Sequence, residues 1–277
     1  MIETYTEFEQ FKKKAQEMGV GVNLSELLEI QVTFLESYEE YVIINIKTTG
    51  ESPNNILILN EKNALLYSDK TFGEKDYKMF RYTLQKPFGE STVLAFLALR
   101  SVLSEYEGIF KIVDEKTDGL EKKYEIGEAE EATSRLRRLT NRVEDFVNLM
   151  MSLEERKIRQ VNTSLIAYDY GLVLAKAQHL LDRCRNHLNQ LRDIQRDADV
   201  RQMRETNKRI EDLTNVMKKL TAITVILMIP TAIASHFGMN FRYMPELSIP
   251  EAYPAVVVGQ IILTVAIALY LKWKGWL

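Results

Sequence analysis

The chain has 277 residues, of which 46% are hydrophobic and 27% are charged, so it is too apolar to be a disordered chain. Its formal net charge of −3 excludes the strongly basic surface that nucleic-acid binding requires. The single cysteine, Cys184, excludes a disulfide within the chain and indicates a reducing compartment, and we expect it to be a small hydrophobic residue at an interface.

The N-terminal part predicts a domain of mixed helices and strands. Residues 7–18 have the spacing of a short amphipathic helix. Segments 40–47 and 55–60 are rich in β-branched and large apolar residues and predict strands, with 30–35 and 64–68 as weaker candidates. The first residues include acidic side chains and lack the apolar stretch of a secretory signal, so we expect this part to be cytosolic.

Long helices follow. Residues 93–110 have helical spacing, and Gly119 and Gly127 are expected to end that helix. We therefore place the cytosolic α/β domain at 1–127. Residues 128–171 then predict one long cytosolic helix, with a break at its end, because 128–168 contain neither glycine nor proline.

Residues 172–219 predict a stalk helix that continues into an apolar segment. One face of it carries residues spaced by three, four or seven, which is close to a heptad. This stripe consists of Met203, Ile210, Leu213, Met217, Leu220, Thr224, Met228, Thr231 and Ser235. From Thr224 onward the stripe becomes polar inside an apolar helix. In lipid, such a polar face should point to a partner helix or to water.

Two segments near the C-terminus predict membrane spans. Residues 220–240 and 253–271 contain no Asp, Glu, Lys or Arg, and about 20 such residues cross the ~30 Å hydrocarbon core. A loop at 241–252 joins them, and a basic tail occupies 272–277. Pro230 lies inside the first span, where it removes a backbone hydrogen bond.

The charges beside the spans predict their orientation. Lys218 and Lys219 precede the first span, and Lys272 and Lys274 follow the second, whereas the loop has Arg242 as its only basic residue. The positive-inside rule then places both termini in the cytoplasm and the loop outside the plasma membrane. Because two helices cannot enclose a water-filled pore, the polar stripe implies several copies around an axis, with the first span lining the pore.

A short motif ends the first span. It consists of Gly238, Met239 and Asn240 and is followed by the loop residues Tyr243, Met244, Pro245, Glu246 and Leu247. A Gly-Met-Asn tripeptide followed by Met-Pro-Glu-Leu, set between two terminal spans, closely resembles the CorA family of magnesium transporters. Residues 215–231 are also similar to this family, whereas the N-terminal domain matches only in its order of elements.

The resemblance implies an α+β membrane protein that assembles as a funnel-shaped homopentamer. It implies a channel, not an enzyme, that passes hydrated Mg²⁺, and also Co²⁺ or Ni²⁺, under the membrane potential and is gated by intracellular Mg²⁺. Gly238, Met239 and Asn240 would form the selectivity filter. The residues lining the pore would be Met217, Leu220, Thr224, Met228, Thr231 and Ser235.

The chemistry suits this reading because Mg²⁺ gives up its water reluctantly, so neutral acceptors can bind its hydration shell instead. One feature departs from it. Arg242 follows the motif directly, where a cation would repel the ion. Acidic stalk residues that offer candidate regulatory ligands are equally typical of a solvated helix face; they are Asp193, Asp197 and Asp199.

Two other functions stay open. A transporter of zinc or another divalent cation with the same fold would carry the same motif. A membrane-anchored helical scaffold would explain the long helices but not the polar stripe. An ATP-driven pump is disfavoured because the sequence contains no phosphate-binding Gly-Lys-Ser/Thr loop, no His-Glu-x-x-His and no paired cysteines.

Overall fold

The computed structural model describes residues 1–30, 32–48, 54–123, 126–240, 242 and 244–277, without the side chains of 118–129 and 247. The chain divides into two compact units, Met1–Ala198 and Asp199–Leu277. One helix, α7 (Ala167–Phe237), belongs to both. Each unit is described separately below.

The N-terminal unit contains a five-stranded sheet with the order β1-β5-β4-β3-β2. Strand β1 pairs in parallel with β5, and the other pairs are antiparallel. The strands are β1 (Ile2–Tyr5), β2 (Phe34–Ser37), β3 (Tyr41–Ile46), β4 (Asn55–Asn60) and β5 (Ala64–Tyr67). The two strongly predicted strands, 40–47 and 55–60, and the weaker one at 64–68 are confirmed. The candidate at 30–35 is largely wrong, because Ile30 caps a helix and β2 begins only at Phe34.

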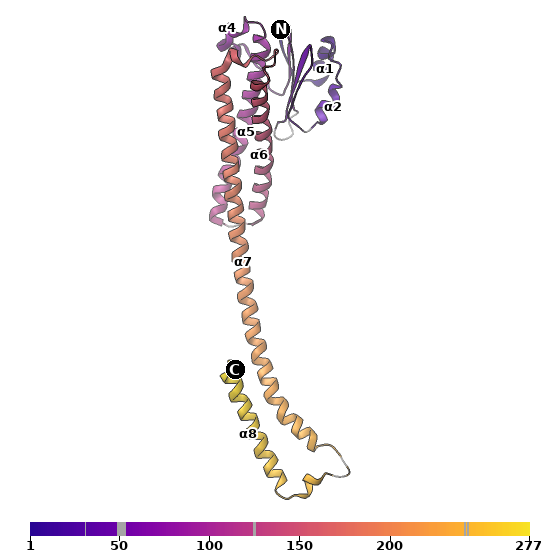
Figure 1. Ribbon diagram of the computed structural model, residues 1–277, viewed down its shortest axis with the longest axis vertical. Coiled ribbons are helices and arrows are strands. Elements are labelled where there is room, and N and C mark those ends of the chain that lie inside the picture. The colour runs from indigo at the N-terminus through magenta and orange to yellow at the C-terminus, as the bar shows by residue number, and fades with distance from the viewer. Residues whose placement is uncertain (31, 49–53, 124–125, 241, 243) are drawn as a thin grey trace. The chain divides into compact units, whose positions relative to one another are not determined.

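Helices cover both faces of this sheet (Figure 1). On one face lie α1 (Phe8–Glu17), which confirms the predicted helix, and α2 (Leu24–Glu29). On the other lies α5 (Gly89–Lys123). Strand β3 is apolar except for Asn45 because both of its faces are covered: Ile43 packs on the side of α1, whereas Ile44 packs on the side of α5. Short helical turns α3 (Glu74–Tyr77), η1 (Lys78–Phe80) and α4 (Arg81–Leu84) precede α5.

Helix α5 pairs with α6 (Ile126–Glu155), and the buried rings of Tyr106 and Phe146 meet edge to face between them. The prediction that Gly119 and Gly127 end a helix is wrong. Gly119 lies within α5 and Gly127 within α6, because a glycine costs a helix only about 1 kcal/mol, which packing offsets. The junction of the two helices, 124–125, lies outside the described residues.

The single helix predicted for residues 128–168 is also wrong. Helix α6 ends at Glu155, Lys157 has a φ of 46°, and a 3-10 turn, η2 (Thr163–Ile166), leads into α7. Tertiary contacts fix this break, since the Tyr170 hydroxyl donates to the Met150 carbonyl in α6 at 2.7 Å. The break predicted at the end of residues 128–171 is also wrong at its last residue, because Gly171 lies inside α7.

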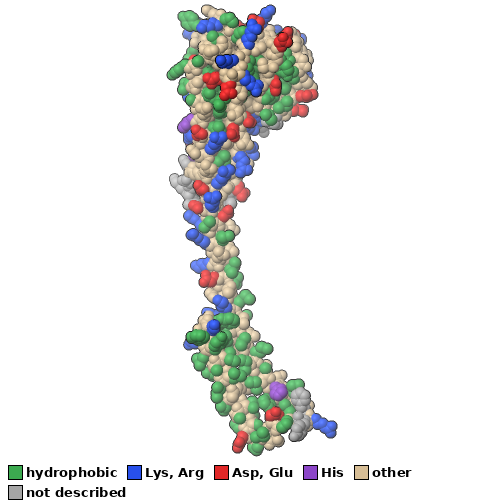
Figure 2. All heavy atoms as spheres, in the orientation of Figure 1, with side chains coloured by type: hydrophobic (Ala, Val, Ile, Leu, Met, Phe, Trp, Pro, Cys, Tyr) green, Lys and Arg blue, Asp and Glu red, His purple; other side chains and the backbone are tan. Residues whose placement is uncertain are grey.

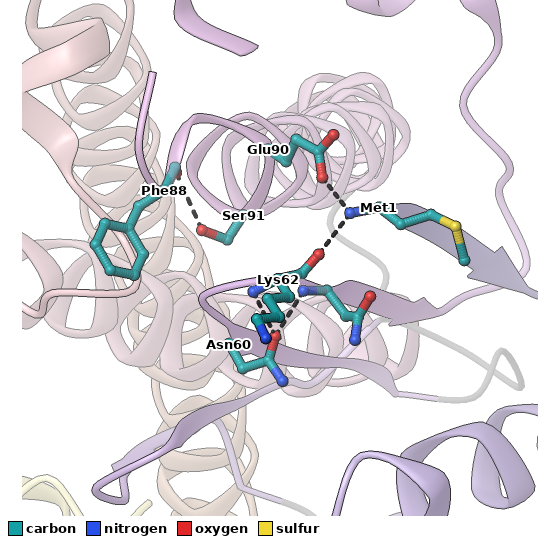
Figure 3. Close-up of polar contacts among 7 residues, drawn as sticks. Met1, Asn60, Lys62, Phe88, Glu90 and Ser91 are labelled. Atoms are coloured by element: carbon teal, nitrogen blue, oxygen red, sulfur yellow. Dashed lines mark hydrogen bonds and ion pairs between the residues drawn. The ribbon is translucent and has the colours of Figure 1, made fainter. Parts of the chain in front are cut away.

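The start of β1 is held against α5. The Met1 amine donates to the Glu90 carboxylate and to the Lys62 carbonyl at 2.6 Å (Figure 3). Asn60 shapes the β4–β5 turn, because its side-chain oxygen accepts from the Lys62 amide at 2.9 Å. These contacts fix the sheet edge that includes β1 at the first turn of α5.

The C-terminal unit contains the second part of α7, the 3-10 turn η3 (Pro245–Ser248) and α8 (Ala252–Trp273). By length and composition α7 and α8 are both candidate membrane spans. Hydrophobic side chains cover most of the surface of α8 and the end of α7 (Figure 2). The predicted α/β N-terminal part and long helix are therefore confirmed, and α7 and α8 supply two C-terminal helices that qualify as candidate spans.

Candidate functional site

The predicted stripe on α7 is exposed in the single chain. Met217, Leu220 and Met228 are 67%, 64% and 66% exposed. The polar members of the stripe, Thr224, Thr231 and Ser235, are exposed as well. Apolar side chains at this exposure leave a large surface without a partner in this chain.

The face of α7 that packs in the single chain is a different one. Ala222 is fully buried, and its neighbours along the same face are partly buried; they are Ile226, Ile229, Ile233 and Phe237. Apart from Phe237, these residues lie two positions before members of the stripe: Ile226 precedes Met228, and Ile229 precedes Thr231. Two positions correspond to about 200° around a helix with 3.6 residues per turn. The buried face and the stripe therefore lie on opposite sides of α7.

Helix α8 covers that buried face. A pocket between α7 and α8 is lined by Ile233 and Phe237 from α7 and by Val256, Val257 and Gln260 from α8. Since α8 occupies this side, the stripe is turned away from it. The sequence analysis identified the stripe but not the residues on the opposite face. Their regular position two residues before members of the stripe could have revealed them.

The hydroxyl groups of the two threonines in the stripe donate hydrogen bonds to backbone carbonyls of α7. Thr224 donates to the Leu220 carbonyl at 2.9 Å, and Thr231 donates to the Leu227 carbonyl at 2.8 Å. Both hydroxyls can thus lie in an apolar helix without an unsatisfied donor. Each oxygen keeps lone pairs that can only accept, which suits the hydrogens of water bound to a cation.

The Gly-Met-Asn motif forms the turn directly after α7. The Gly238 amide donates to the Ala234 carbonyl at 2.9 Å, and the Met239 amide donates to the His236 carbonyl at 3.4 Å. A Cβ on Gly238 would lie 3.2 Å from the Ala234 oxygen, so a side chain at this turn would be crowded against the helix end. The turn therefore begins at the negative end of the helix macrodipole.

Met239 and Asn240 are exposed on this turn, Met239 to 51%. The site combines carbonyls at a helix end, a neutral amide and no acidic group of its own. Such an arrangement can hydrogen-bond the water around a cation without stripping it.

The loop after the motif is a short 3-10 turn. Pro245 opens it, and the Ser248 hydroxyl donates to the Pro245 carbonyl at 2.6 Å. Arg242 and Glu246 are exposed, and Met244 is partly buried. Tyr243 of the predicted outer loop lies outside the described residues, as does the side chain of Leu247.

Helix α8 ends in a glycine cap. Gly275 has a φ of +72°; its amide donates to the Lys272 carbonyl at 3.1 Å, and the Trp276 amide donates to the Leu271 carbonyl at 3.0 Å. This is a Schellman motif, which satisfies the last carbonyls of the helix. Lys274 lies 5.8 Å from the centre of the Trp273 ring, a pairing suited to a membrane interface.

The acidic residues of α7 that were considered for metal binding do not gather into a site in the single chain. Asp193 pairs with Arg196 at 3.8 Å on the helix surface. Across the described residues, no three His, Cys, Asp or Glu side chains gather as metal ligands. Cys184 is fully buried, and burial raises the pKa of its thiol to about 12, so it packs as a small hydrophobic residue.

The fold and the exposed stripe define a class: a membrane protein with two C-terminal spans and an α/β unit joined to long helices. The profile of the CorA-like Mg²⁺ transporter protein family matches residues 39–273. The chain belongs to this family.

Individual relatives match parts of the chain. The magnesium transport protein CorA of Campylobacter jejuni serotype O:2 is 34% identical over 174 residues, which are 58% of this chain and 48% of the relative. The CorA of Salmonella typhimurium is 39% identical over 62 residues, 22% of this chain and 20% of the relative. The chain thus spans about half the length, or less, of these curated relatives.

Two solved structures share the fold. The complete CorA magnesium transporter of Methanocaldococcus jannaschii has a TM-score of 0.59 at 17% identity, covering 99% of this chain and 88% of that one. The cytoplasmic domain of ZntB from Vibrio parahaemolyticus has a TM-score of 0.56 at 7% identity, covering 73% and 88%. At these identities the likeness concerns the fold alone.

Proposed function

We propose that the chain is one subunit of a homopentameric, funnel-shaped channel that admits hydrated Mg²⁺ into the cytoplasm. The observation that carries the proposal is the exposed stripe of α7 on the side away from α8, which ends at the Gly-Met-Asn turn. Several copies placed around an axis would turn this stripe inward and leave α8 toward lipid. The pentamer itself is carried over from the family.

In this assembly the proposed filter is a ring of Gly238, Met239 and Asn240. Carbonyls and amide oxygens would accept hydrogen bonds from the water of Mg²⁺, because removing that water is costly. Deeper rings of Thr224, Thr231 and Ser235 would add further acceptors. Met217, Leu220 and Met228 would form apolar constrictions that close by dewetting.

The channel is proposed to work without an enzymatic step. The membrane potential supplies roughly 4.6 kcal/mol per 100 mV for a divalent cation, twice the value for a single charge. Lys218 and Lys219 before the first span, and Lys272 and Lys274 after the second, favour cytoplasmic termini and an outer loop in the cell membrane. Intracellular Mg²⁺ is the proposed regulatory ligand as well as the cargo.

The arrangement of the outer mouth determines how Arg242 acts. Arg242 is exposed close to the proposed filter, and Glu246 is exposed two residues beyond Met244. Because exposed charges are screened within about 8 Å at physiological salt, we propose that this pair changes the rate of ion entry and not the ion selected.

Proteoliposome flux tests the proposal. The purified chain should give potential-driven Mg²⁺ uptake, and Asn240→Ala should abolish it while the oligomer keeps its mass in detergent. Asn141→Ala is a matched control because Asn141 is exposed on α6, far along the sequence from the motif. Co(III) hexammine should block uptake if the filter recognises a hydrated ion.

The same assay separates the alternative functions. Preferential uptake of Zn²⁺ would favour a zinc transporter with this fold. No uptake of any divalent cation by an intact oligomer would favour a scaffold. Wild-type uptake by Asn240→Ala would remove the filter assignment.

A further inference from the structure

A cavity of about 620 Å³ lies in the N-terminal unit, between the start of α5 and the segment that joins α6 to α7. It has no role in the proposed ion path. Its lining consists of Phe88 before α5, of Glu154, Lys157, Ile158 and Arg159 around the end of α6, and of Val161, Asn162, Thr163, Ser164, Ala167 and Tyr170 around the start of α7. This volume falls in the range of pockets for small organic ligands.

Buried contacts hold the walls of this cavity in place. The Ser91 hydroxyl donates to the Gln160 carbonyl at 2.5 Å, and the Asn162 amide donates to the Thr92 hydroxyl at 2.9 Å. Ile158 and Val161 are buried, at 7% and 3% exposure. The wall segment is therefore tied to the first turn of α5, and the cavity is formed before a ligand arrives.

Both described non-glycine residues with a positive φ line this cavity. Phe88 has a φ of 60° and Lys157 has a φ of 46°. Backbone in this region is unfavourable for residues with a Cβ and tends to be kept where a site needs it. Here the two residues with this backbone conformation contribute an aromatic side chain and a basic side chain to the lining of one cavity.

The cations of the cavity lack acidic partners. Among the described residues, neither Lys157 nor Arg159 forms an ion pair. The Arg159 guanidinium lies 5.6 Å from the centre of the Phe88 ring. Glu154 is the one carboxylate in the lining, so two cations face one anion and favour a ligand of negative charge.

Figure 3 shows the Phe88 ring pointing away from Glu90 and Met1. The Glu90 carboxylate is engaged with the Met1 amine. The ring therefore belongs to the cavity wall and not to the contacts that hold the sheet edge.

The remaining polar groups suit a phosphate. The Thr163 hydroxyl belongs to a residue that lines the cavity, whereas the Ser164 hydroxyl already donates to the side-chain oxygen of Asn162. A threonine hydroxyl can donate a hydrogen bond to a phosphate oxygen. The apolar part of the lining, Phe88 with Ile158 and Val161, offers a surface for a planar ring.

We propose that this cavity binds an organic phosphate of nucleotide size. Its phosphate groups would lie at Lys157, Arg159 and the Thr163 hydroxyl, and its ring would contact Phe88. The proposal does not depend on ion transport, so its outcome is separate from that of the flux assay.

Calorimetric titration of the full-length chain in detergent with ATP, in the presence of EDTA, tests the proposal. We expect saturable binding, and Lys157→Ala combined with Arg159→Ala should weaken it by roughly tenfold to a hundredfold. Lys13→Ala combined with Lys75→Ala is the control, because both residues are exposed in the same unit outside the cavity. That pair should leave the affinity unchanged.

Two single variants separate binding from folding. Lys157→Gly removes the cation and relieves the positive φ, so it should raise the unfolding temperature while it weakens ATP binding. Phe88→Leu should weaken ATP binding but leave binding of inorganic triphosphate unchanged. Absent or non-saturable ATP binding, or equal affinity in the double variant and its control, would overturn the proposal.

Discussion

In residues 1–198 most large apolar side chains are enclosed by their own unit, whereas in residues 199–277 most of them stay exposed. Tyr106 and Phe146 are fully buried against each other in the first unit. Met217 and Met228 are about two thirds exposed in the second, at 67% and 66%. One copy of the chain therefore completes the core of the first unit only.

The exposed apolar side chains of the second unit can be covered only by something outside the single chain, such as lipid or further copies of the chain. Lipid can cover α8 without selecting any one face, because the apolar residues of α8 surround it almost completely. Lipid does not explain why α7 carries threonine and serine on the side opposite α8. Further copies of the chain explain that asymmetry.

The largest expected effect concerns the core of the first unit. Phe146→Ala removes a fully buried ring and should cost about 3–5 kcal/mol of the free energy of unfolding. We expect the unfolding temperature, followed by circular dichroism of the full chain in detergent, to fall by roughly 10 °C. Met228→Ala is the matched truncation in the second unit and should leave that temperature nearly unchanged.

A comparable loss in both variants would contradict the comparison between the units. It would mean that Met228 is packed in the folded protein as tightly as Phe146.

A smaller effect is expected for the apolar constriction of the second unit. Met228→Ser replaces an exposed thioether by a hydroxyl and should wet the proposed constriction, raising Mg²⁺ flux in proteoliposomes by up to about tenfold. Leu227→Ser is the control, since Leu227 is equally exposed, at 62%, but lies about 100° away around the helix. Equal changes in flux would show that the stripe has no special orientation.

Some parts of the fold could be predicted from the sequence and others could not, depending on whether they are determined by local or by distant residues. The spans, the stripe and the strands at β3 and β4 follow from hydrophobic patterns that act over a few residues. The end of α6 does not, because it depends on contacts such as that of Tyr170 with Met150, whose partners are distant in the sequence. The back face of α7 was missed because its residues, such as Ile226, Ile229 and Ile233, are apolar like most of the span, so only their offset from the polar stripe distinguishes them.

The smallest expected effect follows from the glycine that was expected to interrupt α7. Gly171 is helical, and a Cβ there would meet no atom within 4 Å. Gly171→Ala should therefore raise the free energy of unfolding by about 0.5–1 kcal/mol, measured by thermal unfolding.

Gly238→Ala provides the contrast in the second unit. Its Cβ would lie 3.2 Å from the Ala234 oxygen, which is tighter than ordinary contact. We expect it to reduce Mg²⁺ flux by displacing the Gly-Met-Asn turn. A stabilising effect of Gly238→Ala with full flux would show that this turn tolerates a side chain.

Cysteine labelling tests most directly whether the stripe of α7 lines a water-filled path. The native Cys184 is fully buried and its thiol pKa is raised to about 12, so it should not react in the assembled protein. Ser235→Cys should react with a charged, membrane-impermeant thiosulfonate, lose flux on labelling and be protected by Mg²⁺, whereas Ile233→Cys should do none of these. Labelling of Ile233→Cys with Ser235→Cys unreactive would contradict the account.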